Sequence, residues 1–207
     1  MALQVHQHAS DEPERSALAF YYDFASPESY LALEHLAKSL GSLAPELVPL
    51  EQRALSPLVP PASTDDERRA RIEQLAVGRD LLPLNWPAAW PELDTADAVR
   101  AATYAKSIGK VAVYSLSLLR QIFAGGADPA DRVTLYLAGA ASEIHPRAID
   151  QVFARERTQA MVEEALIDAR AVGLTTLPAL RIRDELITGP TLLDDPADLL
   201  ARALEHE

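Results

Sequence analysis

The chain has 207 residues and no cysteine, and its 19 basic and 31 acidic side chains give a formal charge of −12 at pH 7. Without cysteine it has no disulfide, no thiolate of its own and no cysteine-ligated metal, and its negative charge argues against nucleic acid as a partner. No apolar run reaches the roughly 20 residues of a membrane-spanning helix, and the N-terminus lacks the pattern of a signal peptide. We therefore expect a cytoplasmic protein without a membrane partner.

The first 16 residues are polar and predict a disordered tail. They include His6 and His8, two positions apart. Metal sites in proteins generally need three or four fixed ligands, which a mobile tail does not supply. No metal site is expected.

The folded part begins with a strand and a helix. Residues Ala17–Phe24 are rich in aromatic side chains and predict a buried strand. Ser26 is a favoured helix N-cap and Pro27 a favoured first helical residue, and the apolar spacing after them predicts a helix. Glu46–Glu51 predicts a second strand, which Pro49 places at a sheet edge or makes irregular. Such a strand–helix–strand unit implies two parallel strands.

The middle of the chain is expected to be helical, because five segments carry apolar residues at the spacing of amphipathic helices. They are Asp65–Leu82, Thr95–Ile108, Val111–Ala124, Pro129–Ser142 and Arg155–Val172. Three prolines and both tryptophans lie in Pro83–Pro91, which predicts a rigid loop. The strand pattern returns in Pro178–Ile187 around a turn at Arg183-Asp184, and Pro196–Leu204 predicts a last helix.

This order of elements predicts an α/β fold with a helical insertion. We assign residues 17–55 and 174–207 to one α/β domain, and residues 56–173 to the insertion. Sheets of this kind bind ligands beyond the carboxyl ends of their strands, where helix N-termini present unpaired N–H groups. Ser26 lies at such a place, where its hydroxyl can stabilise an anion such as a bound thiolate. A plain N-cap role explains its position at least as well.

Two further places are candidates for ligand contacts. Leu177-Pro178 opens a strand, a setting in which cis peptides recur, although trans is the ordinary state. Trp86 and Trp90 can form the wall of an apolar pocket with Asn85 as its orienting polar group. Equally, the two tryptophans can fill the seam between insertion and sheet.

The stretch Tyr22–Ala32 resembles the opening motif of the DsbA-like thioredoxin superfamily. It is most similar to the branch of 2-hydroxychromene-2-carboxylate isomerases and kappa-class glutathione transferases, in which a serine, here Ser26, replaces the first cysteine of disulfide oxidoreductases. Ala171–Ala179 resembles the family's segment before a cis-proline. The resemblance covers nearly the whole chain from residue 18. It implies a thioredoxin fold (DsbA-like) with a large all-helical insertion, and commonly a homodimer.

The resemblance also implies a function, that of a glutathione-dependent isomerase or transferase acting on an aromatic or chromene-type electrophile. The catalytic residue is then Ser26, which donates a hydrogen bond to the glutathione thiolate. The implied glutathione contacts are Ser26, Leu177, Pro178, Gly189 and Thr191. The expected substrate pocket consists of Phe24, Asn85, Trp86 and Trp90. Disulfide oxidoreductase activity is excluded, because the chain has no thiol.

Two departures from the family pattern support an alternative. The family's Gly-x-Asp-Arg after the last strand is here Gly189-Pro190-Thr191-Leu192, and residues 53–63 form a short, proline-rich segment in place of a longer loop. Both ends of glutathione therefore lack an evident partner. The alternative is a divergent, non-redox thioredoxin-fold protein that binds another small molecule or a protein partner without catalysis.

Overall fold

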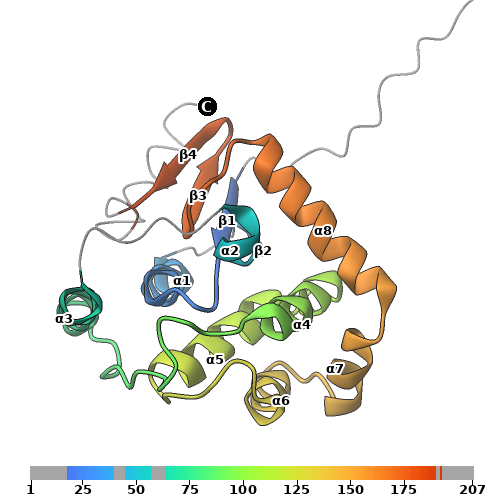
Figure 1. Ribbon diagram of the computed structural model, residues 1–207, viewed down its shortest axis with the longest axis horizontal. Helices are drawn as coiled ribbons and strands as arrows, with labels where there is room; N and C mark the ends of the chain where they lie inside the picture. Colours follow the sequence, from blue (N-terminus) through green and yellow to red (C-terminus); the bar gives the residue numbers. More distant parts are fainter. Residues whose placement is uncertain (1–17, 40–44, 57–63, 190–191, 193–207) are drawn as a thin grey trace, which may run out of the picture.

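The computed structural model describes residues 18–39, 45–56, 64–189 and 192, which form four strands and eight helices (Figure 1). The strands are β1 (Leu18–Tyr22), β2 (Glu46–Pro49), β3 (Ala179–Ile182) and β4 (Glu185–Thr188). The helices are α1 (Pro27–Ser39), α2 (Gln52–Leu55), α3 (Asp65–Val77), α4 (Ala96–Ser107), α5 (Val111–Phe123), α6 (Arg132–Ala141), α7 (Pro146–Phe153) and α8 (Glu156–Ala171). The predicted tail of residues 1–16 and the predicted last helix of residues 196–204 lie outside the described residues.

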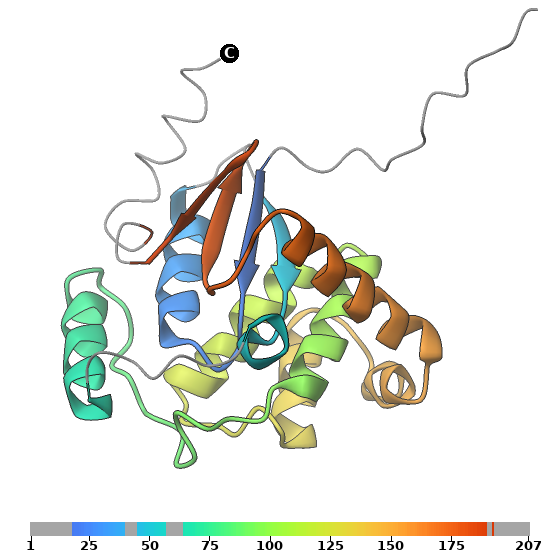
Figure 2. The same ribbon diagram turned by 45° about the horizontal axis from the view of Figure 1, so that its top comes forward.

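The strands form one mixed sheet in the order β2-β1-β3-β4 (Figure 2). β2 runs parallel to β1, whereas β3 is antiparallel to both β1 and β4. The predicted parallel pair is therefore confirmed. β2 lies at the edge of the sheet, as expected for a strand that contains Pro49, which cannot donate a ladder hydrogen bond.

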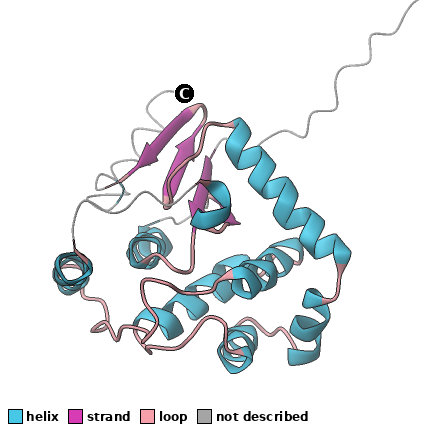
Figure 3. Cartoon of the chain, viewed as in Figure 1, coloured by secondary structure: helices cyan, strands magenta, loops and turns pink. Residues whose placement is uncertain are grey.

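The sheet separates two hydrophobic clusters, because successive side chains of a strand point to opposite faces. From β1, Phe20 and Tyr22 enter a cluster with residues of α1, α4, α5 and α6. Ala19 and Tyr21 enter a second cluster with residues of α2 and α8. Helices accordingly cover both faces of the sheet (Figure 3). Full burial of a side chain such as Phe20 contributes about 1.5–3 kcal/mol to folding. The helices between β2 and β3 thus share their core with the sheet, while the boundaries that we assigned to an insertion stay a prediction.

Two helices were not predicted from the sequence. α2 has only four residues, which is too short for a helical period to be recognised. At α7 the sequence indicates only the helix start, where His145 Nδ1 accepts a hydrogen bond from the Arg147 backbone N–H. The predicted helix over Asp65–Leu82 ends earlier than expected, at Val77.

None of the described helices is both long enough and apolar enough to cross a membrane.

Candidate functional site

The turn between β1 and α1 places Ser26 at the N-terminus of α1, where it is only 8% exposed. Its Oγ accepts a hydrogen bond from the Ser29 backbone N–H at 3.1 Å, which is the N-cap geometry expected from the sequence. The same hydroxyl donates to Glu28 Oε2, also at 3.1 Å. The Ser26 proton therefore already has an anionic acceptor, and this carboxylate lies in the first turn of α1, at the positive end of the helix dipole.

Glu28 is held in place by helix α3. Arg68 donates to both of its carboxylate oxygens, from Nε to Oε1 at 2.9 Å and from Nη2 to Oε2 at 2.6 Å. The Glu28 and Arg68 side chains are 14% and 24% exposed, whereas the more distant Arg71, at 3.4 Å, is 53% exposed. Desolvation raises the pKa of Glu28, but the hydrogen bond and charge of Arg68, together with hydrogen bonds from the Glu28 backbone and from Ser26, outweigh it, so that the pKa lies below its usual value. Glu28 is therefore ionised at neutral pH.

Asp23, the residue after β1, connects three parts of the chain although it is buried. Its Oδ1 accepts hydrogen bonds from the Ala25 N–H at 2.9 Å and from Thr95 Oγ1 at 3.1 Å. Its Oδ2 accepts from the Gln52 N–H at 2.7 Å. Burial raises the pKa of Asp23, although these three hydrogen bonds oppose the shift. The carboxylate ties the β1–α1 turn to the first residue of α2 and to the start of α4.

Gln52 connects this turn to the segment that precedes β3. Its side-chain Oε1 accepts a hydrogen bond from the Leu177 N–H at 2.7 Å, and its Nε2 donates to the Thr175 carbonyl at 2.9 Å. The Leu177-Pro178 peptide is cis. Through Asp23 and Gln52, the structure thus links the turn that carries Ser26 to Leu177.

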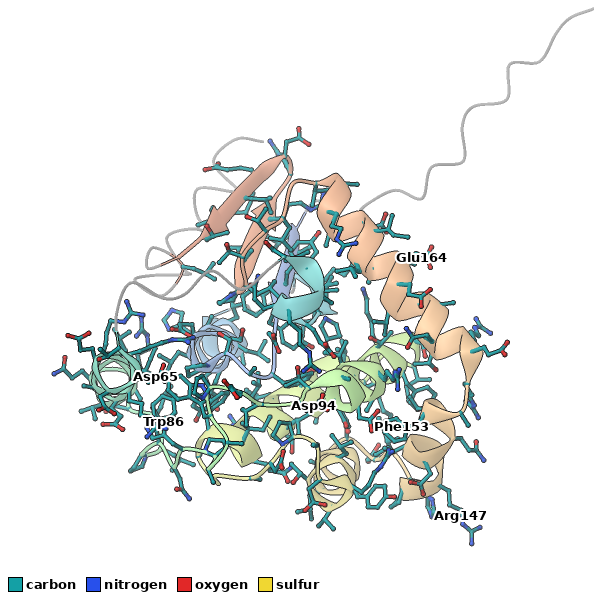
Figure 4. The ribbon with its side chains drawn as sticks, viewed as in Figure 1. Asp65, Trp86, Asp94, Arg147, Phe153 and Glu164 are labelled. Atoms are coloured by element: carbon teal, nitrogen blue, oxygen red, sulfur yellow. The ribbon has the colours of Figure 1, made fainter. Side chains whose placement is uncertain are left out.

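The loop Pro83–Pro91, which carries Trp86 and Trp90, packs in space between α3 and α5. The ring centroids of Trp86 and Trp90 are 4.6 Å apart, and the Trp86 ring also packs edge-on against Phe123 of α5, with 6.2 Å between the two centroids. The Arg69 guanidinium lies over both tryptophan rings, at 5.4 Å and 5.1 Å from their centroids. Trp86 Nε1 donates to Glu73 Oε1 at 2.7 Å, and Figure 4 shows Trp86 beside α3. These contacts fasten α3 to the loop.

The other residues predicted for the site are placed as follows. Phe24 is fully buried, with its ring edge-on to that of Tyr22. Asn85 is tied to the end of α5, because its side chain donates to the Gly125 carbonyl at 3.1 Å. Gly189 follows β4 with a positive φ of 78°, and Thr191 lies outside the described residues. The assignment of these residues to a substrate pocket or to glutathione stays a prediction.

Sequence reasoning missed the residues that connect the site. Gln52 directly follows the predicted strand Glu46–Glu51, and Asp23 follows β1 as the structure bounds it, one residue inside the predicted strand, so a search for polar residues at strand ends identifies both. Nothing in the local sequence pairs Glu28 with Arg68, which lies 40 positions further along the chain.

Two grooves lie away from the candidate site around Ser26, Gln52 and Leu177. One, of about 540 Å³, is lined by residues of α5 with Leu82, Gly125 and Ala141. The other, of about 310 Å³, lies between β2, α4 and α8. Neither groove is lined by Ser26 or Leu177.

Comparison with known proteins identifies one family and several solved structures of similar fold. The model of the DSBA-like thioredoxin domain matches residues 17–204. No curated protein matches the sequence significantly. A solved 2-hydroxychromene-2-carboxylate isomerase is similar with a TM-score of 0.77 and 17% identity, over 91% of this chain and 94% of that one. The cytosolic disulfide reductase DsbM from Pseudomonas aeruginosa is similar with a TM-score of 0.68 and 19% identity, over 92% and 99% of the two chains. Its structure with GSH has a TM-score of 0.64 and 18% identity, over 91% and 97%. At these identities the likeness establishes the fold.

Proposed function

The chain belongs to the DSBA-like thioredoxin domain family, and we propose that it is a glutathione-dependent isomerase or transferase acting on an aromatic or chromene-type electrophile. The observation that carries the proposal is the Ser26 hydroxyl at the N-terminus of the 13-residue helix α1. Because the chain has no cysteine, any thiol chemistry at this position needs a sulfur from outside. The likeness to a 2-hydroxychromene-2-carboxylate isomerase, and the DsbM structure with GSH, support this choice.

The residues present fit a thiol-bearing peptide at two points. Ser26 offers a hydroxyl donor at a helix N-terminus. The Leu177 N–H and the Thr175 carbonyl offer a donor and an acceptor that already bind a carboxamide, that of Gln52. The peptide groups of glutathione have the same donor and acceptor atoms. We therefore propose that Ser26, Leu177 and Pro178 hold the tripeptide, and we keep Gly189 and Thr191 as the further contacts that the family resemblance implies.

In this reaction, the role of the protein is to bind the sulfur of glutathione and to stabilise its thiolate form. When bound, glutathione would supply a thiolate as the nucleophile for an electrophilic carbon. The N-terminus of α1 favours the thiolate over the thiol, and the Ser26 hydroxyl, turned from Glu28 toward the sulfur, adds a charge-assisted hydrogen bond. The pKa of the thiol then falls toward neutrality. Ser26 acts as a donor and forms no covalent bond. For the aromatic substrate, we keep the pocket predicted around Phe24, Asn85, Trp86 and Trp90.

Calorimetric titration with reduced glutathione tests the proposal. We expect binding to the wild type, with roughly tenfold to hundredfold weaker binding to Ser26→Ala, since hydrogen bonds to charged groups contribute about 1.5–3 kcal/mol. The thiolate absorbance of the bound ligand, followed against pH, reports a higher thiol pKa in that variant. Absence of binding at millimolar glutathione contradicts the proposal.

Two matched variants control for the loss of the helix cap. Ser26→Thr keeps both the hydroxyl and the cap, and we expect it to retain binding. Ser29→Ala removes a buried hydroxyl that accepts from the Asp23 N–H at 3.2 Å. If Ser29→Ala weakens binding as much as Ser26→Ala does, the effect arises from the turn and not from the Ser26 donor.

One observation favours the second candidate, a divergent thioredoxin-fold protein that binds another molecule without catalysis. Both groups assigned to glutathione are bound within the chain itself, the Ser26 hydroxyl by Glu28 and the Leu177 N–H by Gln52. A site satisfied in this way can be structural. Turnover of a dinitro-substituted chlorobenzene with added glutathione, lost in Ser26→Ala, distinguishes the enzyme from this candidate.

We also propose that the protein is cytoplasmic and that it forms a homodimer; the family resemblance implies the second of these. The neighbour DsbM is described as cytosolic. Sedimentation equilibrium of the purified chain and fractionation of its source cells test the two parts of this proposal separately.

A further inference from the structure

The side-chain carboxamide of Gln52 forms hydrogen bonds with two backbone groups that lie outside the sheet. The strand β3 begins at Ala179, so residues 175–177 precede its pairing with β1 and β4. Thr175 and Thr176 are exposed. Within this short segment the Thr175 carbonyl accepts from Gln52 Nε2, and the Leu177 N–H donates to Gln52 Oε1.

The pattern of these two bonds is that of a parallel strand. In a parallel ladder, one residue donates its N–H to the carbonyl before its partner and accepts from the N–H after that partner. Gln52 makes the same two bonds around Thr176 with a single side chain. Residues 175–177 therefore present a complete binding edge for one extended peptide residue, and the Gln52 carboxamide imitates that residue.

Gln52 is anchored through its backbone, so its side chain can rotate away from Thr175 and Leu177 without unfolding the surrounding structure. The Gln52 backbone N–H is fixed by the carboxylate of Asp23 at 2.7 Å, so its main chain stays at the start of α2. The side chain is half-buried and uncharged and has three rotatable bonds. Its rotation breaks two neutral hydrogen bonds, both of which a bound peptide restores.

We propose that Gln52 is a gate for a short peptide ligand: its carboxamide closes the edge formed by Thr175–Leu177 in the free protein and is displaced when a peptide group of the ligand takes over both bonds. The proposal rests on the proposed function in naming glutathione as that peptide. It adds that ligand affinity is set by competition with Gln52. Removal of this side chain should accordingly strengthen binding.

Calorimetric titration of the full chain with γ-glutamyl-alanyl-glycine, which has the peptide groups of glutathione but no thiol, measures the gate apart from sulfur chemistry. We expect about tenfold tighter binding by Gln52→Ala than by the wild type. Gln52→Met, which keeps the length of the side chain without its hydrogen bonds, should show a smaller gain in the same direction. Gln74→Ala removes an exposed glutamine of α3 and should leave binding unchanged.

Amide hydrogen exchange at Leu177, followed by NMR, gives a second readout. In the free Gln52→Ala protein this amide should exchange faster than in the wild type, and added tripeptide should restore its protection. Unchanged or weaker tripeptide binding by both Gln52 variants, or no binding by any variant, overturns the gate. Tighter tripeptide binding by Gln52→Ala, combined with glutathione that binds no better than the thiol-free analogue and is indifferent to Ser26→Ala, supports the gate and contradicts the thiolate function.

Discussion

The two ends of the candidate site differ in how the chain fills them. At the hydroxyl end, which consists of Ser26, Glu28 and Arg68, a carboxylate accepts the serine proton and is itself fixed by a two-point ion pair. At the amide end, which consists of Gln52, Thr175 and Leu177, a neutral carboxamide makes two backbone hydrogen bonds. The hydroxyl end also holds α3 against α1, whereas the amide end joins the first residue of the short helix α2 to the segment before β3. A ligand can therefore displace Gln52 by exchanging one set of neutral hydrogen bonds for another. To receive the Ser26 hydrogen bond, by contrast, a ligand must compete with the Glu28 carboxylate, which Arg68 holds in place.

The largest expected effect is the loss of the ion pair. Arg68→Ala leaves the largely buried Glu28 carboxylate without its two-point partner, and we expect the free energy of unfolding to fall by about 2–4 kcal/mol. Arg71→Ala is the matched control, because this arginine is half-exposed and more distant from Glu28, and should cost under about 1 kcal/mol. Urea unfolding of both variants measures the difference. Equal losses would show that the hydroxyl end is not braced by Arg68.

The next effect concerns the residue that connects the two ends. Asp23→Asn replaces the oxygen that accepts from the Gln52 N–H, or the one that accepts from Ala25 and Thr95, by a donor. A buried donor then faces another donor, which should lower the free energy of unfolding by about 1–3 kcal/mol. Asp94→Asn, at an exposed carboxylate, is the control for the change of charge. If thermal unfolding finds both variants equally stable, Asp23 does not hold the two ends together.

A smaller effect is expected at Thr95, whose hydroxyl donates to Asp23 from the start of α4. Thr95→Val keeps the shape and removes the donor, at a cost of about 1 kcal/mol. Thr95→Ser keeps the donor and should recover most of that stability. The comparison by guanidinium unfolding isolates this one hydrogen bond, and a serine variant as unstable as the valine variant would assign the loss to packing.

The smallest effect is the dependence of stability on pH at the hydroxyl end. Because the folded-state pKa of Glu28 lies below the ordinary glutamate value of 4.5, its ionised form stabilises the fold above that pH. This contribution is lost as the pH falls through the folded-state pKa. We expect the difference in unfolding free energy between the wild type and Glu28→Gln to be constant at neutral pH and to shrink below about pH 4.5. A difference that grows on acidification contradicts the lowered pKa.

Much of the fold could be predicted from local sequence. The aromatic run of β1, the serine–proline start of α1 and the apolar spacing of α4 and α5 act over few residues, so their signals are readable without tertiary contacts. The short helix α2 could not be predicted in this way. Its first residue, Gln52, is fixed by Asp23, 29 positions earlier in the chain.

The amino-acid sequence is enough to show that any thiol chemistry of this protein needs an external sulfur, and that Ser26 caps a helix at the end of a strand. The groups that compete for that site are set by tertiary packing. Arg68 reaches Glu28 across 40 positions and Gln52 reaches Leu177 across 125. The physical reason is that a hydrogen bond depends on atoms within about 3 Å, and packing, not sequence spacing, brings such distant residues together.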